Sequence, residues 1–148
     1  MCNVIFRPAA TSQNNMNSLE IAQRKSLRIL LNKSWYCSKS ELYSLRILPV
    51  SVLCNVNISI NVFKVSSNML KNNVQILVAN QRHNHKTRSR ENFVIPQCQT
   101  QLGSKNFYIR GFTLYNTLSQ TIKKTNTLSL FKSRIKEYFY ESYYDANN

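Results

Sequence analysis

The sequence predicts a mainly α fold: a small helical domain, or a set of helical hairpins, with a long irregular basic loop at about residues 71–104. Two observations support this prediction. Apolar residues recur at helical spacing in residues 18–32 and again between residues 105 and 140, which is typical of helices with one buried face. Residues 71–104 contain no long periodic segment and hold the densest basic cluster. We therefore expect one helical domain at residues 18–141, flanked by an irregular segment and a frayed tail at residues 1–17 and 142–148.

The C-terminal part has the clearest helical pattern. A first helix is expected at about residues 105–118, with Ser104 as its cap. It is predicted from apolar positions three to four residues apart, namely Phe107, Ile109 or Arg110, Leu114, Leu118 and Ile122. Thr125 and Asn126 are cap candidates for a second, amphipathic helix. Its apolar face has Leu128, Phe131, Ile135, Tyr138 and Phe139, and its polar face has Lys132, Arg134, Lys136 and Glu137.

These two helices can bury their apolar faces only against each other or against earlier elements. The pair is therefore either a docking or nucleic-acid-facing hairpin, or a core hairpin with a solvated basic face. Both interpretations fit the same pattern of residues.

The N-terminal part contains another helical pattern, at residues 18–32. Its apolar stripe is Leu19, Ala22, Ser26, Ile29 and Leu30, broadened by Leu27 and Leu31, and the residues expected to face away from it are Glu20, Gln23, Arg24 and Arg28. A loop at residues 33–38 holds the only tryptophan, Trp35, beside Tyr36. Ser38 and Glu41 have the spacing of a capping box and predict a short helix as far as Leu45.

Residues 50–70 fit two structures. Val52, Cys54, Val56, Ile58, Ile60 and Val62 alternate with polar residues, which is the period of a half-buried strand. Leu53, Val56, Ile60 and Phe63 also share one helical face, and a strand of this length would be unusual. The residues alone favour a strand. Proline at position 49 is compatible with a helix start.

Composition favours a polyanion as partner. The formal net charge is +14, from 20 Lys and Arg against 6 acidic residues, and such a field attracts nucleic acid above all. The four cysteines have no Cys-x-x-Cys pair, which predicts free thiols in a reducing compartment. No apolar run is long enough for a membrane span, and the N-terminus lacks the order of a signal peptide. We expect an intracellular protein without a membrane partner, in the nucleus or the cytoplasm.

The basic residues define the candidate site. Phosphate contacts are expected first from Arg82, Lys86, Arg88 and Arg90, and second from Arg24, Arg28, Lys132, Arg134 and Lys136. The alternative for residues 82–90 is an ordinary solvated loop. His83 and His85 could place two imidazoles on one side of an extended segment, but no carboxylate or cysteine pair stands at a fitting distance. We therefore expect no metal and no cofactor.

Catalysis by this chain alone is not expected. Two-metal polymerases and nucleases need clustered carboxylates, whereas the only aspartate is Asp145 and the five glutamates form no cluster in the sequence. With only Gly103 and Gly111, the chain has no glycine-rich phosphate loop. No catalytic residue is assigned.

The order of the motifs resembles one family. The motifs are residues 23–30, Gln-Arg-Lys-Ser-Leu-Arg-Ile-Leu; Glu41-Leu42 with Leu45 and Ile47-Leu48-Pro49; His83-Asn84-His85-Lys86-Thr87-Arg88; Pro96 with Thr100; Arg110-Gly111; Leu114-Tyr115-Asn116; Leu118; Ile122-Lys123; and Leu128 with Phe131-Lys132, Ile135-Lys136 and Tyr138. Their series is similar to the extreme C-terminal region of reverse transcriptases encoded by non-LTR (LINE-type) retrotransposons, jockey-like ones especially. The likeness covers roughly residues 19–140. Three places depart from the family pattern. Tyr115 stands where the family usually has Trp, Ser119-Gln120 replaces Leu-Pro, and His85 stands where Tyr is common.

The resemblance implies a mostly helical region, so we expect residues 50–70 to be helical. It implies that the polymerase palm with its catalytic aspartates lies outside this chain. The expected function is that of a non-catalytic fragment of an RNA-directed DNA polymerase from a transposable element, which binds RNA or DNA weakly and without sequence preference. The alternatives are a docking module that completes the remainder of a reverse transcriptase, and a non-functional pseudogene remnant.

Overall fold

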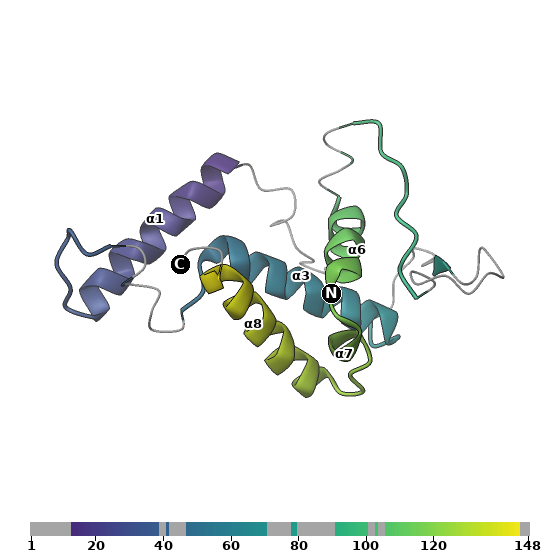
Figure 1. The fold of residues 1–148 in the computed structure, drawn as a ribbon. Coiled ribbons are helices and arrows are strands. Elements are labelled where there is room, and N and C mark those ends of the chain that lie inside the picture. Colours follow the sequence, from purple (N-terminus) through teal and green to yellow (C-terminus); the bar gives the residue numbers. More distant parts are fainter. Residues whose placement is uncertain are drawn as a thin grey trace.

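The computed structural model is described at residues 13–38, 41, 47–70, 78–79, 91–100, 103 and 106–145 (Figure 1). Its helices in these ranges are α1 (Gln13–Leu30), α3 (Val50–Ser66), α6 (Phe107–Thr117), α7 (Gln120–Lys123) and α8 (Leu128–Asp145). No strand occurs in the same ranges, where the β pairing is an isolated antiparallel bridge between Val78 and Phe93. The predicted mainly α fold is confirmed. None of these helices combines the length and the apolarity that crossing a membrane requires.

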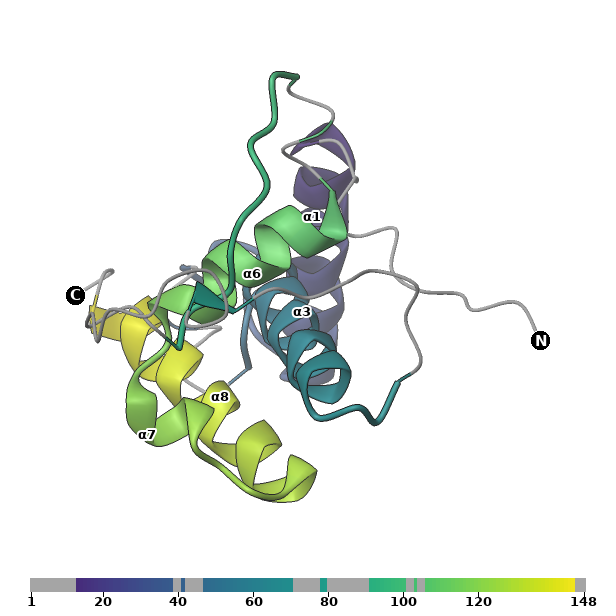
Figure 2. The same ribbon diagram turned by 90° about the vertical axis from the view of Figure 1, so that its right-hand side faces the viewer.

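Helix α3 is the centre of the molecule. It packs against α1, α6 and α8, and the two ribbon views show it between them (Figures 1 and 2). Its buried apolar residues are Val56, Ile58, Ile60, Val62, Phe63 and Val65. A helix covered on several sides carries apolar residues all round. The alternation at residues 52–62 therefore reflects burial on several faces, and the expected helix is confirmed in place of the strand that the residues alone favoured.

Two polar side chains of α3 are buried, and each forms a hydrogen bond within its own helix. The Ser59 hydroxyl donates to the Asn55 carbonyl at 2.9 Å, and the Asn61 amide donates to the Asn57 carbonyl at 2.8 Å. Each bond satisfies a polar group that would otherwise cost free energy in the core. The asparagines and serines that gave the sequence its strand-like alternation are thus compatible with a buried helix.

Helix α8 covers α3 with the apolar face that was predicted. Phe131 and Ile135 are fully buried, and the Phe131 ring stacks on Phe63 with centroids 4.2 Å apart. The predicted caps are wrong, because the Thr127 hydroxyl accepts the Leu130 N–H at 3.4 Å. The helix continues to Asp145, through residues expected to fray.

Helix α6 begins at Phe107, and its cap is Asn106, whose side chain accepts the Tyr108 N–H at 2.9 Å. Ser104, the predicted cap, lies outside the described residues. The buried positions of the helix are Gly111, Phe112 and Tyr115. The predicted stripe is confirmed in part. Leu118 and Ile122 are buried and Phe107 packs against the core, whereas Ile109, Arg110 and Leu114 line an open groove of about 450 Å³ with Asn55, Thr113 and Thr117.

Helix α1 differs most from its prediction. It begins at Gln13, within the segment expected to be irregular, and its predicted apolar stripe is largely exposed: Leu19, Ile29 and Leu30 are 51%, 77% and 79% exposed. The predicted polar side makes the contacts with the start of α3. The Gln23 side chain donates to the Leu48 carbonyl at 2.9 Å and accepts the Val50 N–H at 3.1 Å. These hydrogen bonds dock α1 together with Leu27, the buried member of the stripe, which packs in a small apolar cluster with Leu31, Ile47, Tyr143 and Tyr144.

The capping box at Ser38 is present in part. The Ser38 hydroxyl accepts the Glu41 N–H at 3.2 Å, as the spacing predicted. The helix expected after it falls mainly on residues outside the described ranges.

Candidate nucleic-acid interface

An antiparallel contact joins residues 78–79 to residues 92–93. These residues lie on the two sides of the predicted basic cluster at residues 82–90, which we call the basic segment. Val78 bridges Phe93, and the Ala79 N–H donates to the Asn92 carbonyl at 2.9 Å. The residues just before and just after the basic segment therefore lie side by side. The first-ranked residues Arg82, Lys86, Arg88 and Arg90, together with His83 and His85, lie outside the described residues.

Asn116, near the end of α6, holds Phe93, the second residue of this bridge. Its side chain accepts the Phe93 N–H and donates to the Phe93 carbonyl, both at 2.9 Å. The buried Phe93 ring packs on Phe112 and Tyr115, with centroids 4.8 and 5.1 Å apart. The amide thus replaces a neighbouring strand and ties residue 93 to the helical core.

Lys123 of α7 also contacts this region, which we call the junction: the bridge at Phe93 and the Asn116 side chain that holds it. Its ammonium donates to the Asn92 side-chain oxygen at 3.1 Å and to the Asn116 carbonyl at 2.9 Å. Burial lowers the pKa of Lys123, and the nearby Glu91 carboxylate opposes that shift. The ammonium lies 6.0 Å from the centre of the Tyr115 ring. Lys123 therefore positions the base of the segment and has little freedom to bind a ligand.

Replacing Asn116 with alanine tests this junction. The change leaves the N–H and the carbonyl of Phe93 without their partner, and each unsatisfied buried group costs about 1–3 kcal/mol. We expect the free energy of unfolding to fall by at least that amount in urea denaturation. Thr117→Ala is the control, because the Thr117 hydroxyl is exposed and bonds only within α6, to the Leu114 carbonyl. Equal losses from both changes would contradict the assignment.

Three cations gather where α7 meets α8, and we call Lys123, Lys124 and Arg134 the basic corner. The Arg134 guanidinium donates to the Thr121 carbonyl at 2.9 Å and reaches the Thr125 hydroxyl at 3.5 Å, which holds it against α7. Lys124 is exposed beside Lys123. The one ion pair between described residues is Lys33–Glu41, so no carboxylate in these ranges forms an ion pair with the corner, although Glu91 acts on Lys123 from nearby. Lys124 and Arg134 are exposed and available to phosphates, whereas Lys123 is held by Asn92 and Asn116.

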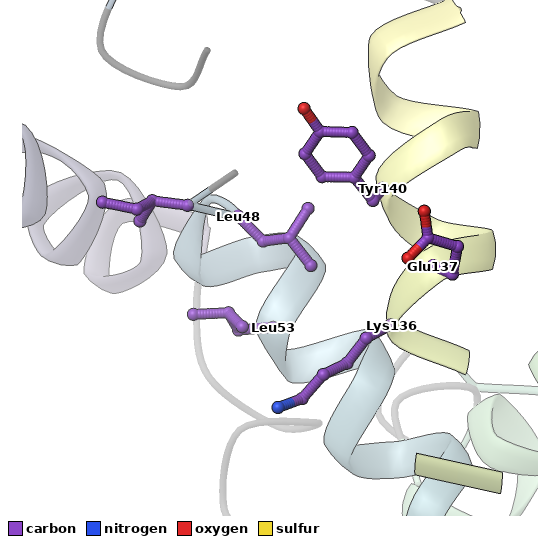
Figure 3. Close-up of a pocket in the computed structure, with 6 residues that line it drawn as sticks. Leu48, Leu53, Lys136, Glu137 and Tyr140 are labelled. Atoms are coloured by element: carbon purple, nitrogen blue, oxygen red, sulfur yellow. The ribbon is translucent and has the colours of Figure 1, made fainter. Parts of the chain in front are cut away.

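Helix α8 does not present its predicted basic residues on one surface. Arg134 contacts α7, whereas Lys136 lines a pocket of about 380 Å³ between α8 and the start of α3 (Figure 3). The pocket is otherwise lined by Ile47, Leu48, Leu53, Glu137 and Tyr140. Lys132 is exposed. Because Glu137 lies beside Lys136, this pocket offers less positive charge to an anion than the basic corner does.

The two predicted residues of α1 belong to a different region. The Arg24 guanidinium donates to the Glu20 carbonyl at 3.3 Å. Arg28 donates to the Cys37 carbonyl at 3.1 Å and lies 5.5 Å from the centre of the Trp35 ring. They are engaged with their own helix and with the turn after it, and are not part of the basic corner.

Sequence reasoning missed Lys123 and Lys124. The available signal was two adjacent lysines in the short connection between two predicted helices. No group of three or more His, Cys, Asp or Glu side chains within the described ranges is arranged to hold a metal. Comparison of the chain with protein-family models, curated proteins and solved structures finds no match.

Proposed function

We propose that this protein binds RNA or DNA without sequence preference and has no catalytic activity alone, as a fragment similar to the C-terminal region of a non-LTR retrotransposon reverse transcriptase. The observation that carries the binding proposal is the position of the basic corner. Lys123 both belongs to the corner and bonds to Asn92, at the base of the segment that contains Arg82, Lys86, Arg88 and Arg90. Lys123 thus connects the basic corner to Asn92, which pairs with Ala79, and the four predicted cations lie between residues 79 and 92 in the sequence.

Electrostatics supports the same proposal. The net charge of +14 raises the local concentration of any polyanion, and each cation that neutralises a phosphate releases a counterion. The contacts to phosphate carry no base information. Binding of this kind is weak at physiological salt and insensitive to sequence.

Salt-dependent fluorescence anisotropy with a labelled single strand of mixed sequence tests the proposal. We expect the logarithm of the association constant to fall linearly with the logarithm of the salt concentration. Lys124→Gln and Arg134→Gln should each reduce the magnitude of that slope by about 0.7. Lys25→Gln is the matched control, because Lys25 is also an exposed lysine but lies on α1.

A second pair of changes examines the segment. Arg88→Ala with Arg90→Ala should weaken binding to RNA and DNA and reduce the slope again. Unchanged affinity would exclude these two arginines from the interface. If neither these changes nor those at the basic corner alter the slope, the proposed interface is wrong.

The alternative function, a docking module for the rest of a polymerase, is supported by one observation. Leu19, Ile29 and Leu30 expose a large part of their apolar surface on α1. Docking through such residues would persist or strengthen as salt is raised, whereas phosphate binding would weaken steeply. The salt titration therefore separates the two functions.

A further inference from the structure

The turn after α1 exposes two aromatic rings next to each other. Trp35 is 62% exposed and Tyr36 is 95% exposed, and they are the exposed aromatic residues among those that the structure describes. Large aromatic side chains carry a substantial hydrophobic surface that is normally buried. Two adjacent exposed rings are therefore a candidate contact surface.

The backbone of this turn is held in place. Asn32 takes a positive φ of 48°, which ends α1, and the Lys33 N–H donates back to the Arg28 carbonyl at 2.9 Å. The Cys37 N–H donates to the Ser34 carbonyl at 3.0 Å, and the Cys37 side chain is buried against Leu27. The two rings between these anchor points are exposed without being on a free end.

Positive charge lies against the same turn. The Arg28 guanidinium is 5.5 Å from the centre of the Trp35 ring, and its bond to the Cys37 carbonyl fixes it there. The Nε atom of Arg28 is buried without a hydrogen-bond partner. Lys33 is paired with Glu41 at 3.1 Å, so that carboxylate is already neutralised by an adjacent cation. The turn thus combines exposed rings with an arginine that has no carboxylate partner in the described ranges.

We propose that Trp35 and Tyr36 form a stacking site for unpaired bases, so that the nucleic acid bound by this protein is single-stranded. This inference rests on the proposed function and adds the class of nucleic acid to it. Aromatic rings beside a cationic surface bind single strands because every base offers a π face, whereas a duplex hides those faces in its own stack. The net charge of +14 favours this partner over a protein surface of ordinary charge.

The only tryptophan in the chain reports on its own site. We expect the intrinsic fluorescence of Trp35 to be quenched by a 20-nucleotide oligothymidylate, and not by a duplex of the same length. In anisotropy measurements, Trp35→Ala and Tyr36→Ala should each lower single-strand affinity by about 5- to 150-fold and leave duplex affinity unchanged. Tyr36→Phe keeps the ring and should retain affinity. Circular dichroism verifies that these exposed positions do not disturb the fold.

The outcomes separate this inference from the proposed function. Salt-dependent binding of the oligonucleotide without quenching, and with no effect of either alanine, overturns the stacking site and leaves the phosphate-binding function intact. Failure to bind any nucleic acid overturns both. A shift of the Trp35 emission to shorter wavelength as the protein alone is concentrated would place the turn against a second copy of the chain, and would overturn the stacking site.

Discussion

Replacing Phe131 with alanine is expected to remove about 3–5 kcal/mol from the free energy of unfolding. Phe131 is fully buried where α8 crosses α3. Its ring stacks on Phe63 at 4.2 Å and lies 6.3 Å from the Tyr115 ring, so three helices lose contacts at once. The loss is large because neighbours held by other core contacts can refill the cavity only in part.

Urea denaturation followed by circular dichroism measures this effect. Leu130→Ala is the control, because the neighbouring Leu130 is 45% exposed on the same helix and its truncation should cost far less. Similar losses at both positions would mean that α8 does not pack as described. If the protein without substitutions shows no cooperative unfolding transition in urea, the pseudogene remnant is favoured over a functional domain.

The C-terminal helix was predictable because its environment is simple. One side of α8 is buried and the other is exposed, so Phe131 and Ile135 stand out at helical spacing. Helix α3 was ambiguous for the opposite reason. It is covered on several sides, which removes the periodicity, and Ser59 and Asn61 satisfy their polar groups inside the helix. Leu53, Val56, Ile60 and Phe63 also fit one helical face, but the alternation was stronger, and the resemblance to reverse transcriptases decided in favour of a helix.

The orientation of α1 could not be predicted from its apolar stripe. Its docking depends on Leu27, the one buried leucine of that stripe, and on Gln23, whose amide meets the Leu48 carbonyl and the Val50 N–H at the start of α3. These partners are 25 and 27 residues away in the sequence, and no local pattern reveals them. Apolar spacing indicates which side of a helix can be buried, but specific polar contacts can select another side.

The candidate site was predicted only in outline. Arg134 was among the expected cations, but the face of α8 on which it was placed is divided between α7 and the pocket at Lys136. The role of Lys123 depends on Asn92 and Asn116, which approach it only in the folded chain. The proposed interface is therefore a product of tertiary structure, whereas the excess of positive charge is a property of composition.

Gly111 of α6 lies directly against α3, and Gly111→Val is expected to destabilise the protein by about 3 kcal/mol, the upper part of the range for overpacked cores. A Cβ atom added at this position would lie 2.7 Å from the Val62 Cγ2 atom and 3.4 Å from the Ile58 Cγ2 atom. Val62 is only 1% exposed and branched at Cβ, so it has little room to move. The gain in helix propensity on replacing glycine is about 1 kcal/mol at most and does not offset such a clash.

Combining this change with Val62→Ala distinguishes a clash from a general loss of packing. Val62→Ala alone leaves a cavity, but in the double variant the new side chain at position 111 can occupy that space. We expect the double variant to be more stable than the sum of the single effects implies, with a coupling free energy of about 0.5–3 kcal/mol in a urea double-mutant cycle. Strict additivity would mean that the two helices do not meet at Gly111. Because α6 also carries Asn116, the contact at Gly111 sets the position from which the base of the basic segment is held.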